Sequence, residues 1–239
     1  MIIERLKWRK NHWHLDLFTP SHCQNCNHKL QAKDLIPIFS FLILRGKCRY
    51  CRKPISARIF LIEILTGLIF AGAFFSLGFN VSAIFAIILG SILAIIFFYD
   101  AKSQLIPDPL ILILLVLFLI KIIFNFNPVF YSQAVFWQPI LGGLVMFAFF
   151  FFIYLVTRGK GMGLGDAKLG LVLGLFIGVK FSILLLWLSF ALGGSVGLFI
   201  LILRLKKGAD RIAFAPFLVI SFLFIYFLPS LFKWFAILW

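Results

Sequence analysis

Acidic residues are scarce in this chain: 239 residues include 8 Asp and Glu against 23 Lys and Arg, and no His or Cys follows residue 58. The apolar fraction is 63%, well above the roughly 45–50% of ordinary soluble domains. This composition excludes a soluble globular domain and predicts a protein that crosses a membrane several times. The first residues, MIIERLKWRK, are basic and amphipathic, so we expect no cleavable signal peptide.

Seven apolar runs follow a polar segment, residues 1–58. They predict transmembrane helices at 59–79, 81–99, 109–126, 136–156, 167–179, 181–203 and 214–237. The run 167–179 is shorter than the roughly 20 residues of a typical spanning helix. We therefore expect an all-α, polytopic membrane helix bundle of about seven helices over residues 59–239, preceded by a small domain at 1–58.

The basic residues indicate the orientation of the chain. Twelve of the 23 lie in residues 1–58, and most others fall in short loops that seven crossings place on one side. Cytoplasmic loops carry such an excess of Lys and Arg, so residues 1–58 are predicted to be cytoplasmic. Lys121 falls elsewhere, near a helix end where its ammonium can reach the interface. Because membrane topology accounts for the positive charge, we expect no nucleic-acid partner. The lipid bilayer is itself an expected partner.

Two aspartates stand out at the predicted cytoplasmic face. Asp100 ends the run SILAIIFFYD, where the helix dipole disfavours a negative charge. Asp166 lies in GKGMGLGDAK, where Gly163 and Gly165 clear side chains from its approach. Two neighbouring carboxyls share a proton, so one can activate water while the other protonates the substrate. We predict an aspartic-protease pair, with Asp166 the more acidic partner because it lies at a helix N-terminus.

Simpler interpretations of the acidic residues stay open. Asp100 can be an interfacial residue paired with Lys102, and Asp166 can simply cap the following helix. Asp108 precedes Pro109 and is typical of a helix N-cap. Glu63 lies within the first apolar run, where an ionisable group is a functional candidate by default.

All four cysteines form two Cys-x-x-Cys pairs, Cys23 with Cys26 and Cys48 with Cys51, separated by 21 residues. This spacing predicts a structural, tetrahedral Zn²⁺ site. Disulfides are not expected on the cytoplasmic side. His22 or His28 can replace a cysteine ligand. A redox-active pair and cysteines without a role are two further interpretations of the same residues.

Several segments, in this order, resemble the type IV prepilin leader peptidases, which are bacterial membrane aspartic proteases. They are HCQNCNHKLQAKDLIPIFSFLILRGKCRYCRKPIS at 22–56, EILTG at 63–67, YDAKSQLIPD at 99–108, GMGLGDAKL at 161–169 and FAPFL at 214–218. The resemblance implies that Asp100 and Asp166 are catalytic. It also implies cleavage of the basic leader of prepilins or pseudopilins, just after a glycine, at the cytoplasmic face of the inner membrane.

The resemblance further implies methylation of the new N-terminus with S-adenosylmethionine as donor, because the cysteine-bearing members are associated with it. Gly46, Lys47 and Glu63 are the candidate residues, although no Rossmann-type glycine turn is visible. Family members usually begin with a spanning helix before the cysteines. Its absence here leads us to expect either a truncated start or a seven-helix member. The segment IAFAPFL also has alanines where the family tends to have Pro and Gly, and we expect a small effect.

Two other functions fit part of the pattern. Presenilins and signal peptide peptidases also pair Tyr-Asp with G-x-G-D, as at Tyr99-Asp100 and residues 163–166. This sequence lacks the Pro-Ala-Leu motif that such proteases carry near the C-terminus, and those proteases lack a cysteine segment like the one here. A non-enzymatic, zinc-bearing membrane adaptor or transporter would require both aspartates to be dispensable.

Overall fold

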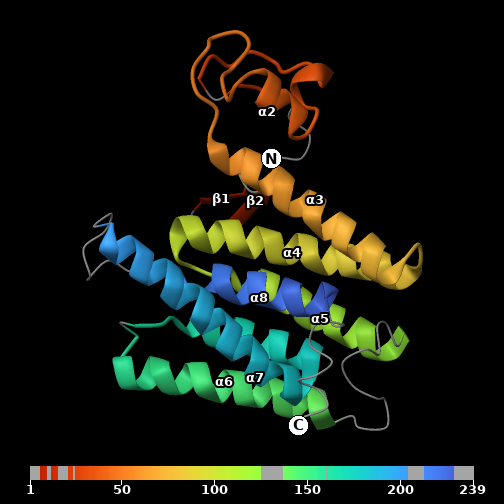
Figure 1. Cartoon of the computed structure of the whole chain (residues 1–239), viewed down its shortest axis with the longest axis vertical. Helices are drawn as coiled ribbons and strands as arrows, with labels where there is room; N and C mark the ends of the chain where they lie inside the picture. The colour runs from red at the N-terminus through yellow and green to blue at the C-terminus, as the bar shows by residue number, and fades with distance from the viewer. Residues whose placement is uncertain are drawn as a thin grey trace. The chain divides into compact units, whose positions relative to one another are not determined.

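The computed structural model describes residues 6–9, 12–15, 21–23, 25–124, 137–159, 161–203 and 213–228. The chain forms two compact units, Met1–Leu68 and Ile69–Trp239 (Figure 1). The boundary falls inside helix α3 (Ala57–Leu77), ten residues after the predicted boundary at residue 58. Each unit is described by itself below.

The N-terminal unit is a small, loop-rich domain. Strands β1 (Leu6–Arg9) and β2 (His12–Leu15) pair antiparallel, a hairpin that the sequence analysis did not predict. A 3-10 turn, η1 (Ala32–Asp34), and a short helix, α2 (Phe39–Ile43), precede the first part of α3. Outside the hairpin, the described elements of the chain are helical, which confirms the expected fold class.

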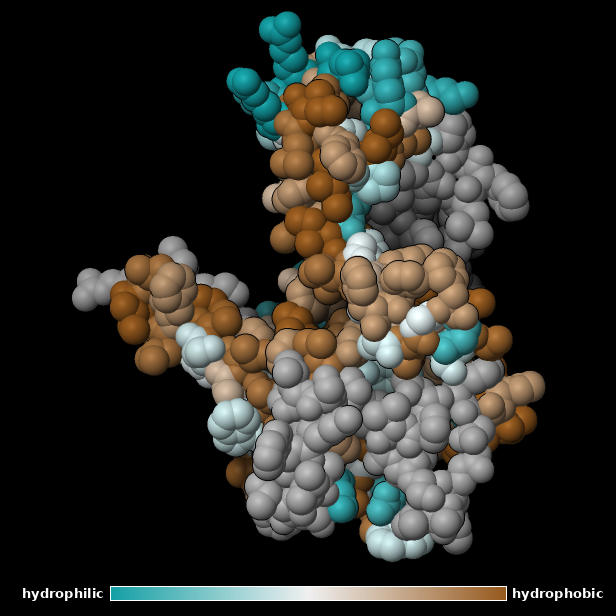
Figure 2. All heavy atoms as spheres, turned by 45° about the vertical axis from the view of Figure 1, so that its right-hand side comes forward, coloured by the Kyte–Doolittle hydropathy of each residue, from teal (hydrophilic) through white to brown (hydrophobic). Residues whose placement is uncertain are grey.

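The second unit is the helical bundle expected for a multi-pass membrane protein. After the rest of α3 come α4 (Val81–Ser103), α5 (Asp108–Phe124), α6 (Trp137–Thr157), α7 (Leu164–Ile202) and α8 (Ala215–Phe227). Among the described helices, α3, α4, α6 and α7 are long and apolar enough to cross a membrane. Hydrophobic side chains cover much of the visible surface (Figure 2), as expected where lipid replaces water.

Helix α7 is two helices joined at a break. Its 39 residues would span about 58 Å, nearly twice the roughly 30 Å hydrocarbon core of a bilayer. Gly178 interrupts it with φ 75° and ψ 172°. Within α6, Gly142 and Phe150 lie against Gly174 and Gly170 of the first part, so those two segments are antiparallel.

The second part of α7 runs back along α6. Ser182 donates a hydrogen bond to the Gly142 carbonyl, and Phe190 stacks on Phe150, so these segments are parallel. The two parts of α7 therefore form a hairpin, in agreement with the separate runs 167–179 and 181–203 predicted from sequence. The first part begins earlier than predicted, at Leu164.

Lys121 corrects one expectation. Its side chain does not reach the interface, because it is 3% exposed. Its ammonium donates to the Phe176 carbonyl at 2.6 Å and lies 5.5 Å from the centre of the Phe176 ring. A helix leaves its last carbonyls without backbone partners. Lys121 thus supplies a charged donor to the end of the helix that Gly178 terminates.

Candidate active site

The structure brings Asp100 and Asp166 together in the second unit. Asp100 lies in the last turn of α4 and is 4% exposed, while Asp166 is part-buried in the first turn of α7. The two carboxyls are close enough for the charge of Asp100 to act on Asp166. Two acidic groups in a poorly hydrated place resist simultaneous ionisation and share a proton readily. The arrangement can therefore perform acid–base chemistry, and the catalytic role stays a prediction.

Asp166 also caps its own helix. Its Oδ2 accepts a hydrogen bond of 3.2 Å from the backbone N–H of Gly163, the N-cap of α7. This contact orients the carboxylate at the positive end of the helix. A role as helix cap and a role in catalysis are therefore compatible for Asp166. The carboxylate oxygen that is bound to the backbone fixes the position of the second carboxylate oxygen.

Asp100 lies near the predicted helix at the C-terminal end of the chain, a proximity that the sequence did not indicate. The backbone N–H of Ala215, at the start of α8, is close enough to act on the charge of the Asp100 carboxylate. The buried Oδ2 of Asp100 has no hydrogen-bond partner among the described residues. Among the described residues no ion pair joins Asp100 to Lys102, so the structure does not support the pairing of these two side chains. Pro216, near the start of α8, was the signal for a helix N-terminus in FAPFL.

The α8 contact weakens one argument from sequence. Asp166 was predicted to be the more acidic partner because a helix N-terminus stabilises its anion. The structure places Asp100 at a helix N-terminus as well, that of α8. A helix terminus therefore no longer distinguishes the two carboxyls, and which of them is the more acidic stays a prediction.

The two glycines before Asp166 have different surroundings. A Cβ on Gly163 would meet Asp166 Oδ2 at 3.7 Å, an ordinary contact that leaves the approach open. A Cβ on Gly165 would lie 3.2 Å from the Cβ of Ile106, in the segment between α4 and α5. Gly165 thus allows this segment to pack closely on the start of α7, a role distinct from the predicted substrate access.

Asp108 has a partner that its sequence position did not reveal. It is the first residue of α5, and its Oδ1 lies 2.6 Å from Lys168 Nζ on α7. Both side chains are exposed, 73% and 46%, so water screens the pair and its contribution to stability is small. It nevertheless joins the segment after Asp100 to the helix that carries Asp166.

The four cysteines converge in the N-terminal unit. Their sulfur atoms all lie within 4.8 Å of one another, and Cys23 Sγ lies 3.9 Å from Cys51 Sγ. Four thiolates around Zn²⁺, each about 2.3 Å from the metal, would be roughly 3.8 Å apart. The donor set therefore fits a closed, tetrahedral zinc site. Among the described residues this cluster contains cysteines alone, and the His28 ring lies 3.6 Å from that of Tyr50.

The two Cys-x-x-Cys pairs share one backbone geometry. The first cysteine of each pair accepts from the N–H four residues later and donates to the carbonyl five residues later, all at 2.9 Å: Asn27 and His28 for Cys23, Arg52 and Lys53 for Cys48. The Asn25 and Cys26 N–H groups lower the pKa of the Cys23 thiol to about 6. The His28 N–H acts in the same direction on Cys26, but desolvation and the neighbouring Cys23 and Cys51 outweigh it and raise the pKa of the Cys26 thiol to about 11. Since zinc binds the thiolate, the backbone favours the metal-binding form of Cys23.

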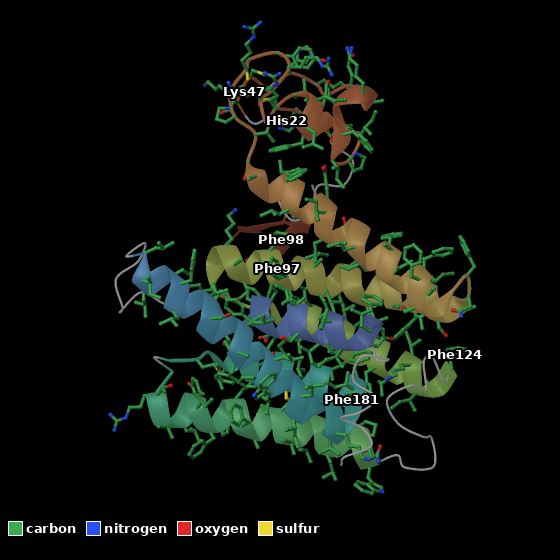
Figure 3. All side chains as sticks on the ribbon, viewed as in Figure 1. His22, Lys47, Phe97, Phe98, Phe124 and Phe181 are labelled. Atoms are coloured by element: carbon green, nitrogen blue, oxygen red, sulfur yellow. The ribbon has the colours of Figure 1, made fainter. Side chains whose placement is uncertain are left out.

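The methyl-transfer candidates lie in the same unit. Gly46 (φ 68°) and Lys47 directly precede Cys48, and Figure 3 labels Lys47 together with His22 in this region. Glu63 Oε2 accepts a hydrogen bond of 2.7 Å from the Ile38 N–H. Within the described residues no hydrogen bond or ion pair joins Glu63 to Gly46 or Lys47. The structure therefore does not assemble them into one polar cluster.

Two protein families match this chain, one over its N-terminal part and one over the helical bundle. The family described as "Bacterial Peptidase A24 N-terminal domain" matches residues 2–77, and the "Type IV leader peptidase family" matches residues 87–198. No solved structure matches.

Three relatives carry the name prepilin leader peptidase/N-methyltransferase. The protein from Aeromonas hydrophila is 35% identical over 221 residues, which cover 92% of this chain and 71% of the relative. The Legionella pneumophila protein is 35% identical over 97% of this chain and 80% of its own length. The Neisseria gonorrhoeae protein is 33% identical over 84% and 68%.

Proposed function

Since this chain belongs to the type IV leader peptidase family, we propose that it cleaves the basic leader of prepilins or pseudopilins with Asp100 and Asp166. Cleavage would occur at the cytoplasmic face of the bacterial inner membrane. The observation that supports the proposal is that two carboxyls from different helices, one of them buried, lie near enough for the charge of one to act on the other.

The reaction follows from the shared proton. The ionised carboxylate takes a proton from water as the water oxygen attacks the scissile carbonyl. The protonated partner donates its proton to the carbonyl oxygen, giving a neutral tetrahedral gem-diol. Collapse of this species breaks the C–N bond, and a proton passes to the leaving amine. The Gly163 N–H holds the Asp166 carboxyl in position throughout, and the Ala215 N–H stabilises negative charge on Asp100.

The four cysteines would hold Zn²⁺, which supplies a structural cross-link because four thiolates leave no open position. We also propose that the chain methylates the new N-terminus, since its relatives are named N-methyltransferases. S-adenosylmethionine would supply the methyl group, with Gly46, Lys47 and Glu63 as candidate residues. Because Glu63 shares no hydrogen bond with the other two within the described residues, we derive no methyl-transfer step.

The experiment is cleavage of a synthetic prepilin by the full chain in liposomes, read by mass spectrometry. Asp100→Asn and Asp166→Asn should each abolish cleavage, whereas Asp108→Asn, a matched aspartate outside the pair, should retain most of it. A mature product heavier by about 14 Da, one added methylene, would support methyl transfer. Full cleavage by either of the first two variants would overturn the proposal.

The two competing functions have weaker support. The matches cover both the cysteine segment and the helical bundle, and presenilin-type proteases lack that segment. A non-enzymatic adaptor or transporter would give no reason for a buried aspartate beside a second carboxyl.

A further inference from the structure

The N-terminal unit exposes an apolar surface that its cysteine site does not explain. We call it the α2 surface. It consists of α2 and the turn before it, with exposed fractions of 39–74%: Leu35, Ile36, Phe39, Leu42 and Ile43. Exposed apolar side chains gathered on one small domain mark a contact with a protein or a membrane. The proposed peptidase chemistry makes no use of this surface.

Two contacts place α2 beside the membrane-crossing part of α3. The Ile38 N–H donates to Glu63 Oε2 at 2.7 Å, and the Phe41 ring stacks on Phe60 with centroids 4.7 Å apart. The candidate span of α3 begins at Ile59. Phe60 and Glu63 therefore belong to its first turns, within about 6 Å of that start at 1.5 Å per residue. A segment packed on these turns lies at the level where the chain enters the bilayer.

The turn that presents α2 is strained. Ile38 has φ 64° and ψ −54°, the geometry of the γ-turn with a positive central φ, which is rare and strained, and a positive φ is especially uncommon for a β-branched residue. The Glu63 carboxylate holds the N–H of that same residue. Strain of this kind persists where the surrounding contacts require a particular geometry. Here the geometry directs Phe41 toward α3 and leaves Phe39, Leu42 and Ile43 exposed.

The charge around the α2 surface suits anionic lipid. Seven exposed basic residues belong to the described part of the same unit: Lys29, Lys33, Arg45, Lys47, Arg49, Arg52 and Lys53. The acidic residue in this segment, Asp34, is bound by Arg49 at 2.7 Å. Figure 2 shows hydrophilic and hydrophobic side chains next to each other on this unit. Apolar side chains flanked by Lys and Arg are typical of segments that lie in the interface of an anionic leaflet.

We propose that the α2 surface inserts into the interface of the cytoplasmic leaflet, with the surrounding Lys and Arg side chains on anionic lipid headgroups. The four-cysteine domain is then docked on the membrane through α2, and Glu63 serves as the tether that fixes α2 to the spanning helix. This proposal is independent of the peptidase chemistry.

The test uses the full chain in nanodiscs that contain phosphatidylglycerol. A photoreactive benzoylphenylalanine replaces Ile43 in one sample and Asn25, an exposed polar residue of the first cysteine pair, in the control. Illumination and mass spectrometry identify the cross-linked partner. We expect lipid adducts at position 43 and few at position 25. Adducts at position 43 to another segment of this chain, or no lipid adduct there, would overturn the proposal.

Glu63 variants test the tether. Glu63→Gln keeps an oxygen that accepts from the Ile38 N–H, so the lipid adduct at position 43 should persist. Glu63→Ala removes the acceptor and should lower that adduct severalfold. If both variants lose it equally, or neither does, the tether is wrong. The same samples assayed for methylation separate the two roles of Glu63, because a role for its charge would be lost in both variants.

Discussion

Gly142→Ala should disturb the contact between α6 and the α7 hairpin. A Cβ on Gly142 would lie 2.6 Å from the Gly178 carbonyl carbon, 2.7 Å from the Gly174 oxygen and 2.8 Å from the Val179 nitrogen. All three atoms belong to the backbone, so no side-chain rotation relieves the clash. Small residues are the usual means by which membrane helices approach this closely.

The magnitude follows from overpacking. Forcing a methyl into a packed contact costs about 1–3 kcal/mol. Alanine recovers about 0.5–1 kcal/mol of the helix-propensity cost of glycine. Because the clashing atoms are all backbone, we take the upper end of that cost, about 3 kcal/mol, which leaves a net destabilisation of about 2 kcal/mol. At roughly 2–4 °C per kcal/mol the unfolding midpoint should fall by about 4–8 °C. Since α7 carries Asp166, prepilin cleavage should also slow.

The assay is thermal unfolding of the detergent-solubilised chain, with Gly194→Ala as the matched control. Gly194 also lies in α7, but a Cβ there meets nothing within 4 Å. The control should be unchanged or slightly stabilised. Equal shifts for the two variants would refute the close α6–α7 contact as the cause.

Three further outcomes test other contacts. Asp108→Lys or Lys168→Asp alone places two like charges side by side and should slow cleavage modestly, unlike the neutral Asp108→Asn, and the double charge swap should restore the rate; a swap no better than the single variants would refute the ion pair. Ala215→Pro removes the donor to Asp100 and should slow cleavage by about 10–100-fold, since hydrogen bonds to charged groups contribute about 1.5–3 kcal/mol; Ala215→Gly keeps the N–H and most of the rate, and equal rates would exclude the contact. Metal analysis should find zinc lost in Cys51→Ser and kept in His28→Ala, and the reverse would assign the ligand to the histidine.

The sequence predicted what depends on local composition. The apolar runs gave the membrane helices because transfer of a segment into lipid depends mainly on the residues within that segment. The break near residue 178 was visible because two runs met there. The cysteine pairs were recognisable for the same reason, since each loop folds by contacts within six residues of its first cysteine. The β1–β2 hairpin was missed because strands of four residues give too little periodicity.

Tertiary structure decided which polar groups meet. Nothing in the sequence around Asp100 indicates that the Ala215 N–H would reach it, because 115 residues separate the two. The same holds for Lys121 on the Phe176 carbonyl and for Asp108 with Lys168. In lipid, each buried polar group requires a partner, but the helices that happen to pack together determine which one. The sequence by itself therefore determined the membrane-spanning architecture and the four-cysteine cluster and predicted the two aspartates, whereas only packing decided which groups surround those aspartates.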